Sequence, residues 1–109
     1  MKILRDESYK TQEKKLKKFD KEQEIYEKII NHIKQCNTIT DLENHSFSGM
    51  YGYEALKDDL SGYHSFNLCK NRGRIRLIFT VNREQNEIKL IYISTEHYED
   101  FKKVKKDFL

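Results

Sequence analysis

The chain has 109 residues, so it is long enough for one compact domain and too short for two domains of ordinary size. Hydrophobic residues make up 37% and charged residues 36% of the sequence, with a net charge of +3. No run approaches the roughly 20 apolar residues that a membrane span needs, the start of the chain holds no signal-like apolar run, and two cysteines do not suit a disulfide-dense secreted domain. We therefore expect residues 1–109 to form a single cytoplasmic domain with no membrane partner.

The first half of the chain has the apolar spacing of helices. A short strand is predicted at residues 2–5, and a helix at residues 8–19. A second helix is predicted at residues 21–36, with Asp20 and Gln23 placed as a capping box. Its apolar positions recur at helical spacing and form one stripe, which consists of Ile25, Ile29, Ile30, Ile33 and Cys36.

Between these helices and the second half, Thr40 and Glu43 indicate one further helical turn. Residues 46–53 contain two glycines and are predicted to form a loop. The first helix also carries a cluster of lysines, which we interpret as its solvated side, with an RNA contact as the alternative. The cluster consists of Lys14, Lys15, Lys17 and Lys18.

The second half alternates apolar and polar residues, as strands do. Strands are predicted at residues 63–69, 74–81 and 87–94, and the turn residues between them favour an antiparallel meander. In the middle strand one face is predicted to be core, with Ile75, Leu77, Phe79 and Val81, and the other to carry Arg74, Arg76, Ile78 and Thr80. The last strand is apolar on both sides and is expected inside the sheet.

An amphipathic helix with Thr95 as its N-cap is expected to end the chain, with Tyr98, Phe101 and Phe108 on its apolar side. The predicted fold class is therefore α+β, with N-terminal helices packed on a small antiparallel sheet of three to four strands and a C-terminal helix. The meander and the helices together define one layered scaffold on which any site must be built.

Metal and nucleotide chemistry are not expected. The histidines and cysteines show neither a CxxC pair nor two histidines at helical spacing; they are His32, His45, His64, His97, Cys36 and Cys69. No glycine-rich loop precedes a GK[ST] element. We therefore expect no metal and no cofactor.

Three motifs in the second half resemble the YoeB branch of the RelE toxin superfamily. They are the run EALKDDLSGY at residues 54–63, the strand RLIFTV at residues 76–81, and the pair His97-Tyr98 after an apolar strand. In that family a similar E-x-L-K-x-x-L-S-G-Y run leads into the sheet, an R-L-[VI]-[YF] strand follows, and His-Tyr comes at the end of the last strand. The resemblance covers residues 54–98 and implies a RelE-like fold.

The resemblance also implies a function. It points to the toxin of a type II toxin–antitoxin system, which cleaves messenger RNA on the ribosome without a metal and is held inactive by a cognate antitoxin. The ribose 2′-hydroxyl would be the nucleophile. Glu54 matches the family's carboxylate and is the expected base, Arg76 the stabiliser of phosphate charge, His97 the acid, and Tyr98 a residue that stacks on a base or aligns the phosphate. The roles of Glu54 and His97 remain interchangeable from sequence.

Positive charge gathers beside this site. No acidic residue occurs between Leu60 and Arg83, whereas Lys70, Arg72 and Arg74 fall in that window. They are predicted to contact RNA backbone, including ribosomal RNA, with the solubility of a sheet edge as the alternative. Two other functions stay open at this point, a ParE-like toxin that binds DNA gyrase and a ribosome- or RNA-binding module without turnover.

Overall fold

The structure, a computed structural model, describes residues 1–69, 75–94 and 101–102. A five-stranded sheet forms its centre, in the order β1-β5-β4-β3-β2. The strands are β1 (Lys2–Arg5), β2 (Glu54–Ala55), β3 (His64–Asn67), β4 (Arg76–Asn82) and β5 (Glu87–Ser94). Strands β3, β4 and β5 form the predicted antiparallel meander, and β5 lies inside the sheet as expected.

The sheet is larger than the three to four antiparallel strands that were predicted. Strand β1 lies at the predicted residues 2–5, but it pairs with β5 in parallel. The two-residue strand β2, which was not predicted, adds an antiparallel edge beside β3. Two residues are too few to show alternation, and the parallel partner of β1 lies more than eighty positions away in the chain. Neither feature can be recognised from a local pattern.

Four α-helices precede most of the sheet in the chain: α1 (Glu7–Leu16), α2 (Asp20–Gln35), α3 (Ile39–Asn44) and α4 (Ser46–Met50). A short 3-10 helix, η1 (Asp58–Leu60), follows β2. Helix α1 begins because the Asp6 side chain accepts a hydrogen bond from the backbone N–H of Ser8, at 3.1 Å. In the same way the Thr38 side chain accepts from the backbone N–H of Asp41 and starts α3.

Two local predictions about helices were wrong. The capping box at Asp20 and Gln23 does not form, because Asp20 is already inside α2, whose N-cap is Phe19 without a side-chain hydrogen bond. The Gln23 amide donates to Glu27 instead. Residues 46–53 are also not all loop, since the His45 imidazole accepts from the backbone N–H of Phe47 and caps the single turn of α4.

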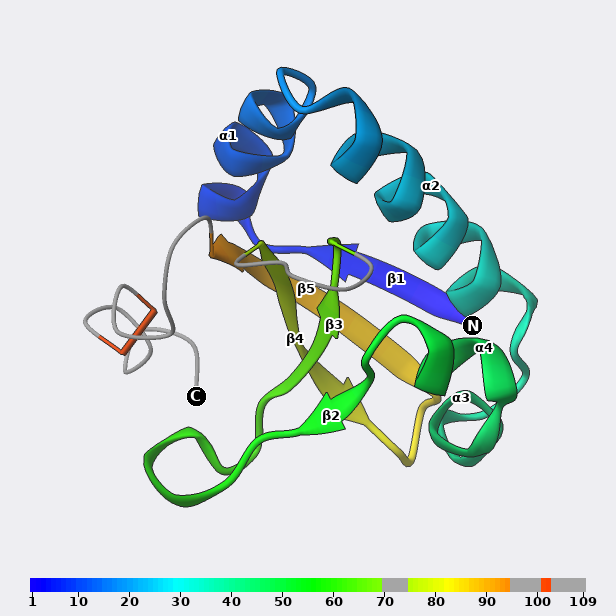
Figure 1. Cartoon of the computed structure of the whole chain (residues 1–109). Helices are drawn as coiled ribbons and strands as arrows, with labels where there is room; N and C mark the ends of the chain where they lie inside the picture. Colours follow the sequence, from blue (N-terminus) through cyan, green and yellow to red (C-terminus); the bar gives the residue numbers. More distant parts are fainter. Residues whose placement is uncertain (70–74, 95–100, 103–109) are drawn as a thin grey trace.

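Helices α1 and α2 lie along one side of the sheet, as Figure 1 shows. The main hydrophobic core fills the space between these helices and the sheet. It includes the predicted α2 stripe and, from β4, Leu77 and Phe79, both fully buried. The predicted core face of β4 is thereby confirmed.

A smaller hydrophobic cluster covers the opposite face of the sheet. It consists of Leu56, Leu60, Tyr63, Ile78, Ile91 and Phe101. Ile78 is fully buried there, so this face of β4 is not simply a row of polar groups. The pairing of β4 with β5 shifts in register between Ile78 and Phe79, as at a β-bulge.

Helices α3 and α4 lie near the end of the sheet where β4 turns into β5 (Figure 1). The side chain of Asn86 in that turn accepts a hydrogen bond from the backbone N–H of Ile39, at 3.2 Å. Asn86 has a positive φ of 50°, which asparagine tolerates better than most residues. The turn thus fixes the first residue of α3.

Of the predicted C-terminal helix, only Phe101 and Lys102 belong to the described residues, and both are helical. The predicted cap at Thr95, the rest of that helix and the turn before β4 lie outside the described residues. Within the described part, no helix is long and apolar enough to cross a membrane.

Candidate functional site

Glu54 is the first residue of the edge strand β2, and its side chain is exposed. The backbone N–H of Asn67 donates to the carbonyl of Tyr51 just before this strand, at 2.8 Å. Gly52, the residue after Tyr51, has a φ of +66°. A Cβ atom at this position would lie 3.1 Å from the Cβ of Asn67. Glycine therefore allows the chain to turn tightly against β3 and to present Glu54 at the sheet edge.

Arg76 is the first residue of β4 and is half-buried. The register of the sheet shows which side chains lie on the same face as Arg76. Ser65 pairs with Glu54 on one side and with Ile78 on the other, and residues paired in register point to the same face of a sheet. Arg76 stands two residues before Ile78 in the same strand and therefore points to that face too.

Glu54 and Arg76 thus share the face that carries the smaller hydrophobic cluster. Two strand spacings and two residues of rise separate them, which places their Cα atoms on the order of 12 Å apart. The long side chains of Glu54 and Arg76, extended toward each other, cover a large part of this distance. Both side chains are therefore long enough to reach one phosphodiester group bound over this face.

The described residues that flank positions 95–100 are Ser94 and Phe101. Ser94 pairs with Arg76 across β4 and β5. Phe101 is fully buried on the shared face, where its ring meets Tyr63 edge-on with centroids 4.8 Å apart and Tyr92 at 5.4 Å. Two of the predicted catalytic residues, His97 and Tyr98, lie outside the described residues, as do the predicted RNA-binding residues Lys70, Arg72 and Arg74.

A second polar cluster was not predicted from the sequence. The Tyr53 hydroxyl lies 2.8 Å from Nδ1 of His64 and donates to Glu43 at 3.2 Å. Arg83 makes two parallel hydrogen bonds to Glu43, both 2.7 Å long. These four residues come from α3, the segment before β2, β3 and the β4–β5 turn, so no spacing in the sequence brings them together.

This cluster is a structural network that runs from the buried His64 through the partly buried Tyr53 and Glu43 to the exposed Arg83. Burial lowers the pKa of His64 below the ordinary value of histidine, and Arg83 lowers it further, although Glu43 raises it. The hydrogen bond from Arg83 holds the pKa of Glu43 below its usual value, and burial raises that of Tyr53. His64 pairs with Ala55, the neighbour of Glu54, so the cluster lies behind β2, on the other face from Glu54.

Nothing in the described parts of the chain forms a group of three His, Cys, Asp or Glu side chains able to hold a metal ion. A cavity of about 470 Å³ does lie beside the end of α2, lined by residues that include His32, Cys36, Asp41 and His45. Burial and the nearby His45 both lower the pKa of His32. Neither Glu54 nor Arg76 lines this cavity.

No protein-family model matches the sequence, and no curated protein matches it either. Solved structures do, and they show that the chain has the fold of the RelE-like bacterial toxins. The YoeB/ParE toxin from Agrobacterium tumefaciens is 21% identical, with 89% of this chain and 100% of that chain covered and a TM-score of 0.58. YoeB from the heterotetrameric YoeB–YefM toxin–antitoxin complex of Staphylococcus aureus is 24% identical, with 89% and 98% covered and a TM-score of 0.57.

The YoeB dimer from Staphylococcus aureus matches equally well, at 24% identity over 89% of this chain and 98% of that chain with a TM-score of 0.57. The matches span nearly the whole of those toxins. They confirm the RelE-like α+β fold that the three motifs predict, including the part of the chain before residue 54, where the sequence matches only in being helical.

Proposed function

We propose that this protein is the toxin of a type II toxin–antitoxin pair and that it cleaves messenger RNA on the ribosome. The observation that carries the proposal is the placement of Glu54 and Arg76 on one face of the sheet, which follows from the register of β2, β3 and β4. The likeness in fold to YoeB toxins supports it, and so does the order of the three motifs.

In the proposed reaction the RNA supplies its own nucleophile. The ribose 2′-hydroxyl attacks the neighbouring phosphorus, Glu54 takes its proton, and the bond from phosphorus to the 5′-oxygen breaks. Arg76 makes paired hydrogen bonds to the phosphate oxygens and stabilises the negative charge that develops on them. The products are a 2′,3′-cyclic phosphate and a 5′-hydroxyl end.

The leaving 5′-oxygen requires a proton, for which the best candidate is His97. Imidazole titrates closest to neutral pH and so exchanges protons readily there. Ser94 pairs with Arg76, and His97 follows Ser94 by three residues in the sequence. Tyr98 stacks on a base or aligns the phosphate, and Lys70, Arg72 and Arg74 bind the RNA backbone of messenger or ribosome.

A cognate antitoxin is part of the same proposal. Two of the similar structures are complexes of YoeB with YefM. By analogy, we propose that this chain has a protein partner that covers the face with Glu54 and Arg76 and keeps RNA from it. The chemistry of that partner is expected to be acidic, because the chain carries a net charge of +3.

The deciding experiment maps RNA ends on translating ribosomes after a short, tightly controlled induction. The wild type is compared with Glu54→Gln, Arg76→Ala and His97→Ala, and with Glu84→Gln as a matched control at an exposed carboxylate in the β4–β5 turn. Removing the base is expected to slow cleavage roughly 10²–10⁴-fold, and removing the arginine roughly 10²–10³-fold. Glu84→Gln is expected to cleave as the wild type does.

Two results would overturn this assignment. One is a wild type that leaves RNA intact on translating ribosomes, and the other is full cleavage by Glu54→Gln or Arg76→Ala. A growth defect that depends on gyrase while RNA stays intact would instead assign the chain to the gyrase-binding class.

A further inference from the structure

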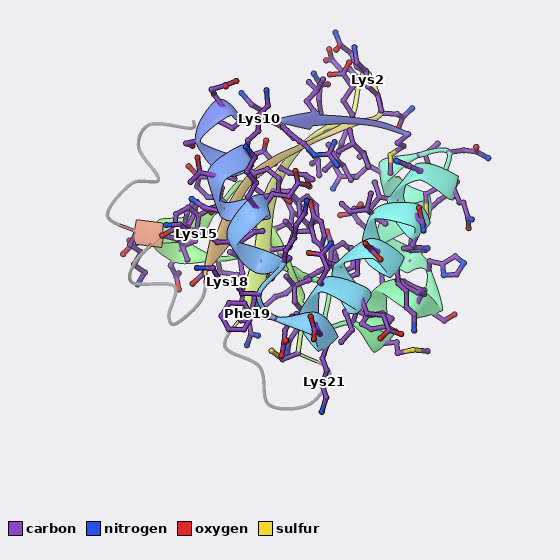
Figure 2. The ribbon with its side chains drawn as sticks, turned by 90° about the horizontal axis from the view of Figure 1, so that it is seen from above. Lys2, Lys10, Lys15, Lys18, Phe19 and Lys21 are labelled. Carbon is purple, nitrogen blue, oxygen red and sulfur yellow. The ribbon has the colours of Figure 1, made fainter. Side chains whose placement is uncertain are left out.

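The end of α1 and the turn into α2 carry a dense group of lysines. We call this group the lysine ridge; it consists of Lys14, Lys15, Lys17, Lys18 and Lys21, and all five side chains are exposed. Figure 2, which looks down on this side of the molecule, shows Lys15, Lys18 and Lys21 along the outside of the α1–α2 corner, with Phe19 beside them. Lys2 lies far from them in the same view.

The ridge has little acidic charge to balance it. Residues 14–21 contain five lysines and one aspartate, a sum of +4. The next carboxylates along α2 have partners of their own, because Glu22 accepts from the Cys69 thiol and Glu24 pairs with Lys28. The nearest carboxylates on α1 are already used, because Glu7 pairs with Lys10 at 3.1 Å and Glu13 pairs with Arg5 at 3.1 Å. Glu13 also accepts a hydrogen bond from the hydroxyl of Tyr26. The uncompensated charge suits a partner with several negative groups in a row.

An apolar pocket opens beside the ridge. It has a volume of about 240 Å³ and is lined by Gln12, Lys15, Leu16, Phe19, Tyr92 and Ile93. Phe19, at its edge, is 43% exposed, which is unusual for a phenylalanine in a small domain. The Gln12 carbonyl oxygen accepts a hydrogen bond from the backbone N–H of Ile93, and the same amide carries two N–H donors that suit a polar edge of a ligand.

These features together fit a nucleic acid strand better than a protein. Lysines placed at intervals bind phosphates along a backbone, and an exposed aromatic ring stacks on any unpaired base. The pocket is of a size for one base. An amphipathic helix would instead need a row of apolar anchors at i, i+3 or i+4, and i+7, whereas this surface offers one ring and one pocket.

We propose that the lysine ridge and the adjoining pocket bind a single-stranded RNA segment, with phosphates on the lysines and one unpaired base against Phe19. The site lies on the helical side of the protein, and it does not depend on the cleavage proposed above. It does reach the same end of the sheet, because Ile93 in the pocket precedes Ser94, which pairs with Arg76. Arg76 points to the face opposite the helices, so an RNA that contacts both sites must pass around this end of the sheet.

The test uses a short fluorescent single-stranded RNA with 2′-O-methyl riboses, which cannot be cleaved by 2′-hydroxyl attack. Its anisotropy is measured against the purified full chain at several salt concentrations. The ridge variant carries Lys14→Gln, Lys15→Gln, Lys17→Gln and Lys18→Gln. The matched control loses the same charge elsewhere, through Lys2→Gln, Lys28→Gln, Lys34→Gln and Lys89→Gln, all at exposed positions.

The ridge variant is expected to bind at least tenfold more weakly, and the slope of log K against log salt to fall by about 3, since each phosphate contact to a single strand contributes about 0.7. The control variant is expected to keep most of the slope. Phe19→Ala is expected to weaken binding roughly 5- to 100-fold without changing the slope, and an abasic oligonucleotide to reproduce this loss with the wild type. Glu84→Gln, the exposed carboxylate in the β4–β5 turn, is expected to bind as the wild type does.

Three outcomes would overturn the proposal. They are equal losses in the ridge and control variants, unchanged binding by Phe19→Ala, or tighter binding of poly-glutamate than of RNA. The last outcome would make the ridge a docking surface for an acidic protein. Circular dichroism and thermal unfolding of each variant show whether a loss reflects the surface or the fold.

Discussion

The hydroxyl of Tyr53 lies 2.8 Å from Nδ1 of His64, and this contact links the residue before Glu54 to the neighbouring strand β3. Around it, Phe79 stacks on the imidazole with ring centroids 5.5 Å apart, and Glu43 lies beyond the Tyr53 hydroxyl. His64 is nearly buried, with 8% of its surface exposed. A positive charge on His64 is unfavourable there, because the carboxylate of Glu43 is already paired with Arg83.

We therefore predict that acid destabilises the protein partly through His64. Its pKa is lowered in the folded state by burial, so the unfolded chain binds the proton more readily. The stability that comes from the neutral imidazole is fully present above the pKa of an unfolded histidine, about 6.5, and is lost as the pH falls from there toward the lower folded value. The measurement is the free energy of unfolding in urea at pH 7.5 and at pH 5.5.

The matched variant is His64→Gln, which cannot titrate. Its free energy of unfolding is expected to change less between the two pH values than that of the wild type. Some dependence remains, because burial also lowers the pKa of His32. Glu43 contributes little in this window, since its stabilising charge is lost only below the usual carboxylate range. An unchanged pH dependence in His64→Gln would contradict the assignment.

The contrast between the two polar groupings shows what the sequence could and could not predict. Strand alternation alone placed Arg76 off the core face. The structure confirms this, because Arg76 lies two residues before Ile78, which points to the face opposite the main core. Its relation to Glu54 needed the pairing of β2 with β3, which two residues cannot reveal. The cluster around His64 joins four segments that no local pattern connects.

The same reasoning explains the success with secondary structure. Strand β5 was predicted with its observed bounds, residues 87–94, because it is apolar on both faces and a turn precedes it. The capping box at Asp20 failed because helix ends depend on one or two residues, and here the chain enters α2 at Phe19 without a side-chain cap. Patterns that repeat over many residues survive such local choices, whereas single positions do not.

A second prediction concerns Asn86 in the β4–β5 turn, which has a positive φ and also accepts the backbone N–H of Ile39. Asn86→Gly removes only the hydrogen bond and is expected to cost about 1 kcal/mol. Asn86→Ala adds the strain of a left-handed backbone, about 1 kcal/mol more. Urea unfolding of both variants tests this, and equal stability of the two would show that the turn relaxes to a negative φ.

The third prediction concerns Phe101, which closes the smaller hydrophobic cluster against Tyr63 and Tyr92. Phe101→Ala is expected to lower the free energy of unfolding by about 3–5 kcal/mol, because the Phe101 ring is fully buried and its removal leaves a cavity. Phe101→Leu keeps most of the apolar volume and is expected to cost less than about 1.5 kcal/mol. A Phe101→Ala variant as stable as the wild type would mean that residues 101–102 do not pack on the sheet in solution.

The fourth prediction compares two glycines that precede Glu54. Gly52 has a φ of +66°, and a Cβ there would lie 3.1 Å from the Cβ of Asn67, so Gly52→Ala is expected to destabilise the protein by about 1–2 kcal/mol. Gly49 lies inside α4, and a Cβ there would meet no atom within 4 Å. Gly49→Ala is therefore expected to stabilise it by about 0.5–1 kcal/mol.

Because the turn at Gly52 sets the approach of β2 to β3, Gly52→Ala is also expected to reduce RNA cleavage, whereas Gly49→Ala leaves it unchanged. Thermal unfolding and the mapping of RNA ends on ribosomes measure the two effects in the same samples. A Gly52→Ala variant that loses stability but cleaves normally would show that the position of Glu54 tolerates a shift of its strand. Destabilisation by Gly49→Ala of the same size would show instead that both substitutions disturb α4, and that the turn has no special role.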